Sequence, residues 1–275
     1  GYKVSLFDPK FKNLNLINKK NVDVIFNALH GKGGEDGIAQ TYFEYLKIPY
    51  THSGVISSHN SMNKIISKEI FVKKKIKTPK FFTLNKKNFN AQGLKKNIIK
   101  KKITFPVVVK PVDEGSSLGV VLCKNKNELM KETKKLFKKY NQLIFEEYVG
   151  GQEIQVAVIN GKPLGAIELV PKRLFYDYKA KYTKSAKTKH IMPAHLSKTS
   201  YNEVLKIAKK AHLVLGCKGI TRSDFKYYNN NFNLLEINTQ PGMTNLSLVP
   251  EIASFKGLSF ENLVEKILLD ASINR

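Results

Sequence analysis

Arginine is almost absent from a chain that is otherwise strongly basic. Of the 47 lysine and arginine residues among its 275 positions, only Arg173, Arg222 and Arg275 are arginine, and the formal net charge is +25. A nucleic-acid surface favours arginine for bidentate contacts and interleaves aromatic residues with it. Here the excess is lysine scattered among asparagine and isoleucine, a pattern that A/T-rich codons explain. We therefore expect the lysine runs to face solvent and no nucleic-acid partner.

The sequence also lacks long apolar runs and closely spaced cysteines. No stretch approaches the roughly 18 apolar residues of a membrane span, and residues 1–4 read as a strand rather than as a signal peptide. The two cysteines, Cys123 and Cys217, have neither metal-type spacing nor the pattern of a disulfide framework. These absences predict a cytoplasmic protein with no membrane partner. The length allows one large domain or two to three smaller ones.

Two acidic strand ends lie near the C-terminus, on either side of the asparagine run 229–231. A polar run between two extended segments predicts a hairpin. Because side chains alternate along a strand, Glu236 and Asn238 face the same side, and an antiparallel partner brings Asp224 beside them, with Arg222 nearby. Two carboxylates and an amide oxygen suit Mg²⁺ that is held partly by substrate phosphates. The alternative is that these are solvated charges at strand ends.

Lys110 ends a predicted strand and precedes a loop of small residues, 115–119. Glycine in such a loop permits positive φ and close backbone approach, so main-chain amides can point at phosphate oxygens, and Lys110 adds a point charge. The pattern differs from the P-loop motif. A simple hairpin with a surface lysine is the alternative.

Three further segments carry candidate function. The acidic segment 145–149, followed by Glu153, can bind an adenine and a ribose between two lobes, although edge strands also carry acidic residues to prevent aggregation. The glycine-rich loop 30–37 follows a buried strand, where ligands gather in α/β sheets, unless His30 only caps a turn. The polar loop 171–193 has the length of a lid, and its aromatic residues favour that interpretation.

The order of predicted elements indicates a parallel α/β layer followed by α+β lobes. In the first fifty residues we expect strands at 3–7, 22–27 and 49–50 and a helix at 37–46. Further helices are predicted at about 61–74, 126–140 and 201–215, and at the C-terminus.

Five segments in this order closely resemble D-alanine–D-alanine ligases of the ATP-grasp superfamily. They are residues 28–37, 49–54, 110–117, 176–182 and 236–244. The resemblance spans nearly the whole chain and implies an ATP-grasp fold, α/β and α+β. An N-terminal parallel α/β domain (residues 1–51), with its first strand missing, would precede a central lobe (52–146) and a C-terminal lobe (147–275) that enclose ATP.

The resemblance implies a reaction and a role for each site residue. ATP phosphorylates one D-alanine, and the acyl phosphate joins a second D-alanine, giving D-alanyl-D-alanine for peptidoglycan in a homodimeric enzyme. Lys64, Lys110 and Lys181 would contact the ATP phosphates. Glu146, Tyr148 and Val149 would bind the adenine, and Glu153 would bind the ribose. Two Mg²⁺ ions, or Mn²⁺ in their place, would be bound by Asp224, Glu236 and Asn238.

The remaining implied roles concern the amino acid substrates. Arg222 and the amide of Gly242 would stabilise the oxyanion, and Ser247 and Leu248 would receive the second carboxylate. Ser116 and Tyr182 would be oriented by an N-terminal Glu, and His30 lies in the expected substrate loop.

The chain departs from the family pattern at two places. It starts beyond the strand and loop that carry the substrate-gripping Glu, which suggests a fragment, and Asn63 stands where Asp is usual, with little expected effect. Two rival functions follow. One is a D-alanyl-D-lactate ligase, against which Tyr182 argues. The other is a non-catalytic nucleotide- or RNA-binding remnant, motivated by the missing Glu and the net charge.

Overall fold

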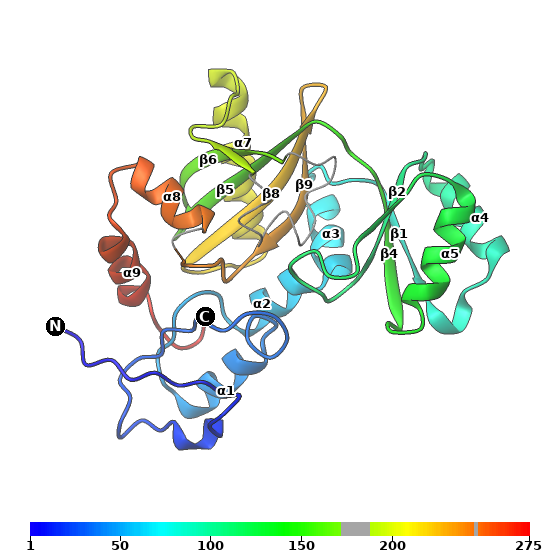
Figure 1. Ribbon diagram of the computed structural model, residues 1–275. Helices are drawn as coiled ribbons and strands as arrows, with labels where there is room; N and C mark the ends of the chain where they lie inside the picture. The colour runs from blue at the N-terminus through cyan, green and yellow to red at the C-terminus, as the bar shows by residue number, and fades with distance from the viewer. Residues whose placement is uncertain (172–187, 245–246) are drawn as a thin grey trace.

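A computed structural model describes residues 1–171, 188–244 and 247–275 of the chain (Figure 1). The helices are α1 (Ile38–Leu46), α2 (Val55–Met62), α3 (Lys64–Lys73), α4 (Ala91–Lys101), α5 (Lys126–Leu136), α7 (Lys198–Val214), α8 (Leu248–Phe255) and α9 (Phe260–Leu269), with short 3₁₀ turns at Leu14–Leu16 and Lys86–Asn88. The strands are β1 (Phe81–Asn85), β2 (Val107–Pro111), β3 (Val121–Cys123), β4 (Gln142–Glu147), β5 (Gln152–Ile159), β6 (Lys162–Val170), β7 (Lys189–Ile191), β8 (Ile220–Tyr228) and β9 (Asn231–Asn238).

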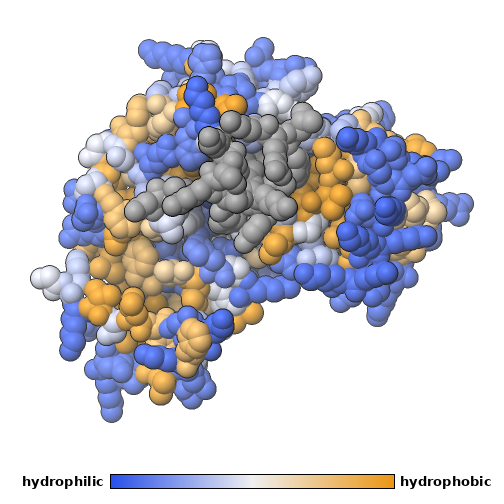
Figure 2. Space-filling model, in the orientation of Figure 1, coloured by the Kyte–Doolittle hydropathy of each residue, from blue (hydrophilic) through white to orange (hydrophobic). Residues whose placement is uncertain are grey.

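The central part of the chain forms an antiparallel sheet in the order β1-β4-β2-β3. Its strands are rich in valine and phenylalanine, which fit a pleated, half-buried surface. Helices α4 and α5 lie against this sheet (Figure 1) and bury Leu94 and Leu129 in its core, beside the stacked rings of Phe82 and Phe145. The outer surface of this lobe is largely hydrophilic in Figure 2, as expected for helices whose lysines face solvent.

The second sheet is also antiparallel and has the order β7-β6-β5-β8-β9 among the described residues. Alternate residues of β5 point to opposite faces: Val156 packs against α7, whereas Ala157 packs against α8 and α9. The sheet is therefore covered by helices on both faces, and β5 is buried along nearly its whole length. This arrangement fixes the hairpin β8–β9 rigidly at one edge.

Residues 1–51 differ from the sequence-based expectation. The predicted strands at 3–7, 22–27 and 49–50 are not formed; the region has only isolated bridges, parallel between Ile25 and Tyr50 and antiparallel between Tyr50 and Ser272. The reason is that residues 1–7 are mostly exposed and lie against no neighbouring strand. Helix α1 is confirmed, and its Phe43 packs on Tyr50 in a small separate core.

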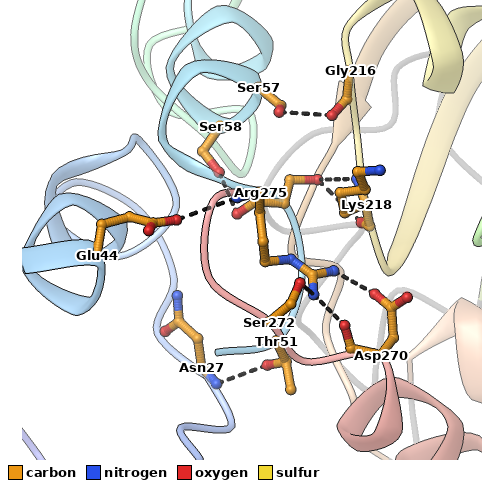
Figure 3. Close-up of polar contacts among 11 residues, drawn as sticks. Asn27, Glu44, Thr51, Ser57, Ser58, Gly216, Lys218, Asp270, Ser272 and Arg275 are labelled. Carbon is orange, nitrogen blue, oxygen red and sulfur yellow. Dashed lines mark hydrogen bonds and ion pairs between the residues drawn. The ribbon is translucent and has the colours of Figure 1, made fainter. Parts of the chain in front are cut away.

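The N-terminal region is held to the C-terminal segment by polar contacts (Figure 3). The carboxylate of Glu44 accepts hydrogen bonds from the Tyr50 hydroxyl (2.8 Å) and from the main-chain amides of Asn274 (3.0 Å) and Arg275 (3.3 Å). The guanidinium of Arg275 is paired with Asp270. Tyr50 and the Arg275 side chain are buried, so these contacts hold α1 to the C-terminal segment.

The helix predicted at about 61–74 is present as α3, but it begins at Lys64. Residues 61 and 62 end the preceding helix α2, and the chain breaks at Asn63 between the two. The Asn63 side chain accepts hydrogen bonds from the amides of Ile65 and Ile66, so it caps the second helix. Asparagine caps helices about as well as aspartate does. The small effect expected of this difference from the family stays a prediction.

The division of the chain at residues 51, 52 and 147 stays a prediction. Phe71 and Ile76, which fall in the predicted central lobe, belong to the core of the five-stranded sheet. Cys123 and Cys217 are buried free thiols. Across the described ranges, no helix has the length and apolar character needed to cross a membrane.

Candidate active site

The predicted acidic hairpin is present, and its register brings the expected residues together. Asp224 of β8 stands opposite Glu236 of β9, and Arg222 stands opposite Asn238. A bulge after Asp224 shifts the register, and the turn at its far end has positive φ at Asn229 (47°) and Asn230 (56°). Asparagine tolerates that conformation better than most residues, which is why the asparagine run forms a tight hairpin turn.

The four predicted site residues of the hairpin, Arg222, Asp224, Glu236 and Asn238, each have a partner inside the protein. The guanidinium of Arg222 holds the Asp224 carboxylate through two bonds, Nε to Oδ1 at 2.8 Å and Nη2 to Oδ2 at 3.0 Å. The Glu236 carboxylate lies 3.7 Å from the Lys64 ammonium. The amide oxygen of Asn238 accepts a bond from the main-chain nitrogen of Gln240 (2.8 Å). The two ion pairs balance the charges of Arg222, Asp224, Lys64 and Glu236.

A first cavity, called cavity 1, lies between the two sheets. From the four-stranded sheet and the segment after it, it is lined by Lys110, Glu146, Tyr148 and Val149; from the five-stranded sheet, by Glu153, Asp224, Lys226 and Glu236; Lys64 of α3 also lines it. Cations and carboxylates thus face one another across a space enclosed by both sheets.

Two buried charges, Lys110 and Glu146, line cavity 1, and a third, Lys68, contacts Glu146 without lining the cavity. The Glu146 carboxylate lies 3.0 Å from the Lys110 ammonium and 3.2 Å from that of Lys68, a residue of α3 that is 0% exposed. Burial alone would raise the pKa of Glu146, but Lys110 and Lys68 hold it below its usual value. Burial lowers the pKa of Lys68 to about 8, although Glu146 opposes that shift. Two cations and one anion leave a net positive charge beneath the cavity.

Glu146, for which the resemblance implies a contact with adenine, has a second role in the structure. Its carboxylate forms ion pairs with both Lys68 and Lys110, and it thereby holds the Lys110 ammonium in place. The Glu153 carboxylate is likewise paired, with Lys226 at 2.9 Å. The main chain of Tyr148 is bonded to Pro106 through its amide (3.3 Å).

A second cavity, called cavity 2, lies on the other side of Lys64 and Glu236, which line both cavities. Its wall includes the predicted residues His30, Ser116, Arg222, Asn238, Gly242, Ser247 and Leu248, together with Glu35, Ser61 and Gln155. The glycine-rich loop 30–37 and the end of strand β9 therefore face each other across this space.

The loop after Lys110 has an unusual backbone. The positive φ expected of a glycine in this loop is present at Gly119 (71°), and Ser116 (51°) and Ser117 (59°) also have positive φ. Non-glycine residues with positive φ each store strain of roughly 1–3 kcal/mol, and such strain concentrates at functional sites. Gly119 has a steric reason, since a Cβ there would meet the ring of Pro111 at 2.8 Å.

Every predicted site residue within the described ranges lines one of the two cavities. Lys181 and Tyr182 lie outside the described residues. Two residues that the sequence did not reveal also belong to the site. Lys68 looks like a surface lysine in the sequence, and its only signal is a spacing of one helical turn from Lys64. Gln155 is 1% exposed, and within the described structure its side-chain oxygen is buried with no hydrogen-bond partner.

The hairpin residues fit a hard divalent cation by their chemistry. Asp224, Glu236 and Asn238 offer two carboxylates and one amide oxygen on facing strands beside lysine-lined space. Among the described residues there is no group of three or more His, Cys, Asp or Glu side chains that could hold a metal. A cation bound here would therefore need further ligands from a phosphate or water.

Models of two family segments match this chain: the D-ala D-ala ligase N-terminus over residues 4–53 and the D-ala D-ala ligase C-terminus over residues 70–269. The chain is 57% identical to the D-alanine–D-alanine ligase of Pelagibacter ubique over all of its own length and 89% of that protein. It is 41% identical to the Geotalea uraniireducens ligase over 99% of this chain and 86% of that one.

Solved structures agree. The crystal structure of the D-alanine–D-alanine ligase from Bacillus anthracis superposes with a TM-score of 0.79 at 33% identity, covering 91% of this chain and 80% of that one. The same ligase complexed with ATP gives a TM-score of 0.78 at 31% identity, covering 91% and 79%. The predicted ATP-grasp fold class is thereby confirmed. The chain belongs to the D-alanine–D-alanine ligase family.

Proposed function

We propose that this protein joins two D-alanine molecules into D-alanyl-D-alanine and converts ATP to ADP and phosphate. The observation that carries the proposal is the shared border of the two cavities, because Lys64 and Glu236 line both. A phosphoryl group entering from cavity 1 and an amino acid carboxylate lying in cavity 2 would meet at this border.

The first step is phosphoryl transfer. A carboxylate oxygen of the first D-alanine attacks the γ-phosphorus of ATP, the bond to the β-phosphate oxygen breaks, and ADP leaves. Two anions must approach each other, and at about 4 Å with an effective dielectric near 20 each unit charge pair contributes roughly 4 kcal/mol. We assign the offsetting charge to Lys64 and Lys110, the latter held by Glu146.

The second step forms the peptide bond. The amine of the second D-alanine attacks the carbonyl carbon of the acyl phosphate, loses a proton, and phosphate leaves as its C–O bond breaks. We assign stabilisation of the oxyanion to Arg222 and the amide of Gly242, and recognition of the second carboxylate to Ser247 and Leu248. All four residues line cavity 2. Preorganised donors of this kind typically contribute the largest share of catalysis.

We assign Mg²⁺ to Asp224, Glu236 and Asn238. When bound, the ion supplies positive charge to phosphate oxygens. Each Asp224 oxygen that accepts a hydrogen bond from Arg222 keeps a second lone pair with which it would bind the ion. Arg222 itself lines cavity 2, where we place the oxyanion. The predicted homodimer remains part of this proposal and rests on the family resemblance.

The test is product analysis with Mg²⁺-ATP and D-alanine. We expect D-alanine-dependent ADP release and a product with the mass of the dipeptide. D-Lactate offered as acceptor beside D-alanine near neutral pH separates the depsipeptide rival, because dominant lactate turnover would overturn the substrate assignment. Retained ATP binding without any product would favour the non-catalytic alternative.

A further inference from the structure

Gln240 occupies the point where the end of strand β9 meets the glycine-rich loop of the N-terminal region. Its side chain is 1% exposed. Its carboxamide oxygen accepts a hydrogen bond from Asn27 Nδ2 at 2.8 Å, and its carboxamide nitrogen donates to the main-chain oxygen of Leu29. Both ends of one side chain are therefore bonded to residues more than two hundred positions away in the sequence.

The same residue also contacts a proposed metal ligand. The main-chain nitrogen of Gln240 donates to Asn238 Oδ1 at 2.8 Å. Gln240 thus bridges Asn238 on one side and the residues immediately before His30 on the other. Asn238 and His30 both line cavity 2, from opposite elements.

The loop that Gln240 contacts is itself held by buried amides. Asn27 Nδ2 donates a second bond to the Gly34 oxygen (3.2 Å), and Gln40 Nε2 of α1 donates to the same oxygen (2.9 Å). Asn27 Oδ1 accepts from the Leu29 amide (3.2 Å). Asn27 and Gln40 hold the loop to the N-terminal region, whereas Gln240 holds it to the five-stranded sheet.

We propose that Gln240 is a positioning residue, which sets the placement of the loop carrying His30 and Glu35 relative to Asn238 and the hairpin across cavity 2. The inference rests on the proposed function. We call the two side-chain hydrogen bonds of Gln240 the Gln240 clamp. A buried amide that loses its partners incurs the full desolvation penalty, so the clamp keeps the two walls of cavity 2 at a fixed distance from each other. Gln240 would thereby tune D-alanine binding without contacting nucleotide, since it does not line cavity 1.

The experiment compares Gln240→Leu, Gln240→Glu and the matched control Gln40→Leu. Gln240→Leu removes both side-chain bonds, and we expect about a tenfold rise in KM for D-alanine with KM for ATP changed by less than about twofold. Gln240→Glu can still accept from Asn27 but cannot donate to Leu29, so its effect should be intermediate. Gln40→Leu removes a bond to the Gly34 oxygen from within the N-terminal region. It should lower thermal stability without raising KM for D-alanine relative to KM for ATP.

Hydrogen–deuterium exchange of the peptide covering residues 28–37 gives a readout that needs no turnover. We expect faster exchange in Gln240→Leu and an intermediate rate in Gln240→Glu, which also carries the test if the leucine variant does not fold. An unchanged KM for D-alanine with unchanged exchange would overturn the inference, as would an equal KM shift in Gln40→Leu. A wild-type protein that makes no dipeptide would instead contradict the proposed function, while the exchange comparison would still test the clamp.

Discussion

The Lys64 ammonium lies 3.7 Å from the Glu236 carboxylate, and these two side chains line both cavities of the protein. Lys64 begins helix α3, directly after its cap Asn63, whereas Glu236 lies near the end of β9. The side-chain exposures are 7% and 29%. A cation from one element and an anion from another therefore mark the place where the proposed phosphoryl transfer occurs.

Replacing Glu236 with glutamine should abolish turnover while leaving the fold intact. The substitution keeps the shape but removes the negative charge that pairs with Lys64 and that would bind Mg²⁺. We expect kcat to fall by about 1000-fold or more, the range found when a preorganised charge in an active site is removed. Steady-state ADP release measures the loss, and circular dichroism checks the fold. An unaffected rate would remove the hairpin from the mechanism.

The buried Lys68 should make ATP binding depend on pH. Burial lowers its pKa to about 8, with Glu146 opposing the shift, Lys110 adding to it and Glu236 favouring the charged form. As pH rises through this value, Lys68 loses its charge and the net positive charge beneath cavity 1 falls. We expect KM for ATP to rise above pH 8, on the order of tenfold.

Lys68→Met should remove that pH dependence and give a uniformly raised KM for ATP. The exposed Lys134 of α5 provides the matched control, and Lys134→Met should retain the wild-type profile. In the wild-type protein, stability should change with pH in the opposite sense to ATP binding: binding weakens above pH 8, whereas stability increases. Between pH 8 and the ordinary lysine value of 10.5, the unfolded state binds the proton more tightly, so the Lys68 contribution to the free energy of unfolding rises with pH. A flat KM profile in the wild type would contradict the account.

Gln155 should contribute to function at a cost in stability. Its buried side-chain oxygen has no hydrogen-bond partner within the described structure and lies in the wall of cavity 2. We expect Gln155→Leu to raise the free energy of unfolding by about 1 kcal/mol, because an unpaired buried polar group is removed. We also expect it to raise KM for D-alanine about tenfold, through loss of an acceptor for the substrate ammonium.

Ser223 supplies the control for Gln155. Its hydroxyl is also buried without a partner among the described residues, but it lies on β8 between Arg222 and Asp224 and so faces the opposite side of the sheet. Ser223→Ala should leave both Michaelis constants unchanged. If Gln155→Leu is stabilising and fully active, the side chain has no role in binding D-alanine.

Gly54 should not tolerate a side chain. A Cβ at this position would overlap the main-chain oxygen of Arg275, where the C-terminal segment packs against the start of α2. Overpacking of this kind destabilises by about 1–3 kcal/mol, so we expect Gly54→Ala to lower the urea midpoint of unfolding. In Gly93→Ala the new Cβ would lie 3.2 Å from the Asn90 side chain inside helix α4, and the gain in helix propensity should keep the change within about 1 kcal/mol. Equal midpoints for the two variants would show that the segment moves aside readily.

The hairpin could be predicted because its signals are local. Asparagine at 229 and 230 permits the turn, and the period of two along a strand places Glu236 and Asn238 on one face. Three of the five matching segments, 28–37, 110–117 and 236–244, contribute lining residues to the cavities. Helix α2 was partly missed, because its Val55–Met62 sequence is rich in serine and its apolar pattern is weak.

Features set by tertiary contacts could not be predicted. Lys68 is fully buried with two partners: its ammonium pairs with Glu146, far along the chain, and donates a hydrogen bond to the Thr78 hydroxyl, ten residues away. The strand pattern at 22–27 predicted a strand that the structure replaces with a single bridge, since strand formation depends on a neighbour that sequence periodicity does not reveal. The Gln240 clamp is of the same kind, because its partners lie at the other end of the chain.

The most direct test of the proposed chemistry follows oxygen from substrate to phosphate. D-Alanine labelled with ¹⁸O in its carboxylate is incubated with the protein and Mg²⁺-ATP. The masses of the dipeptide and of the released phosphate are then measured by mass spectrometry. The account predicts D-alanyl-D-alanine, with one labelled oxygen transferred to each phosphate, because the carboxylate attacks phosphorus and its C–O bond later breaks. Unlabelled phosphate, or ADP release without dipeptide, would contradict it.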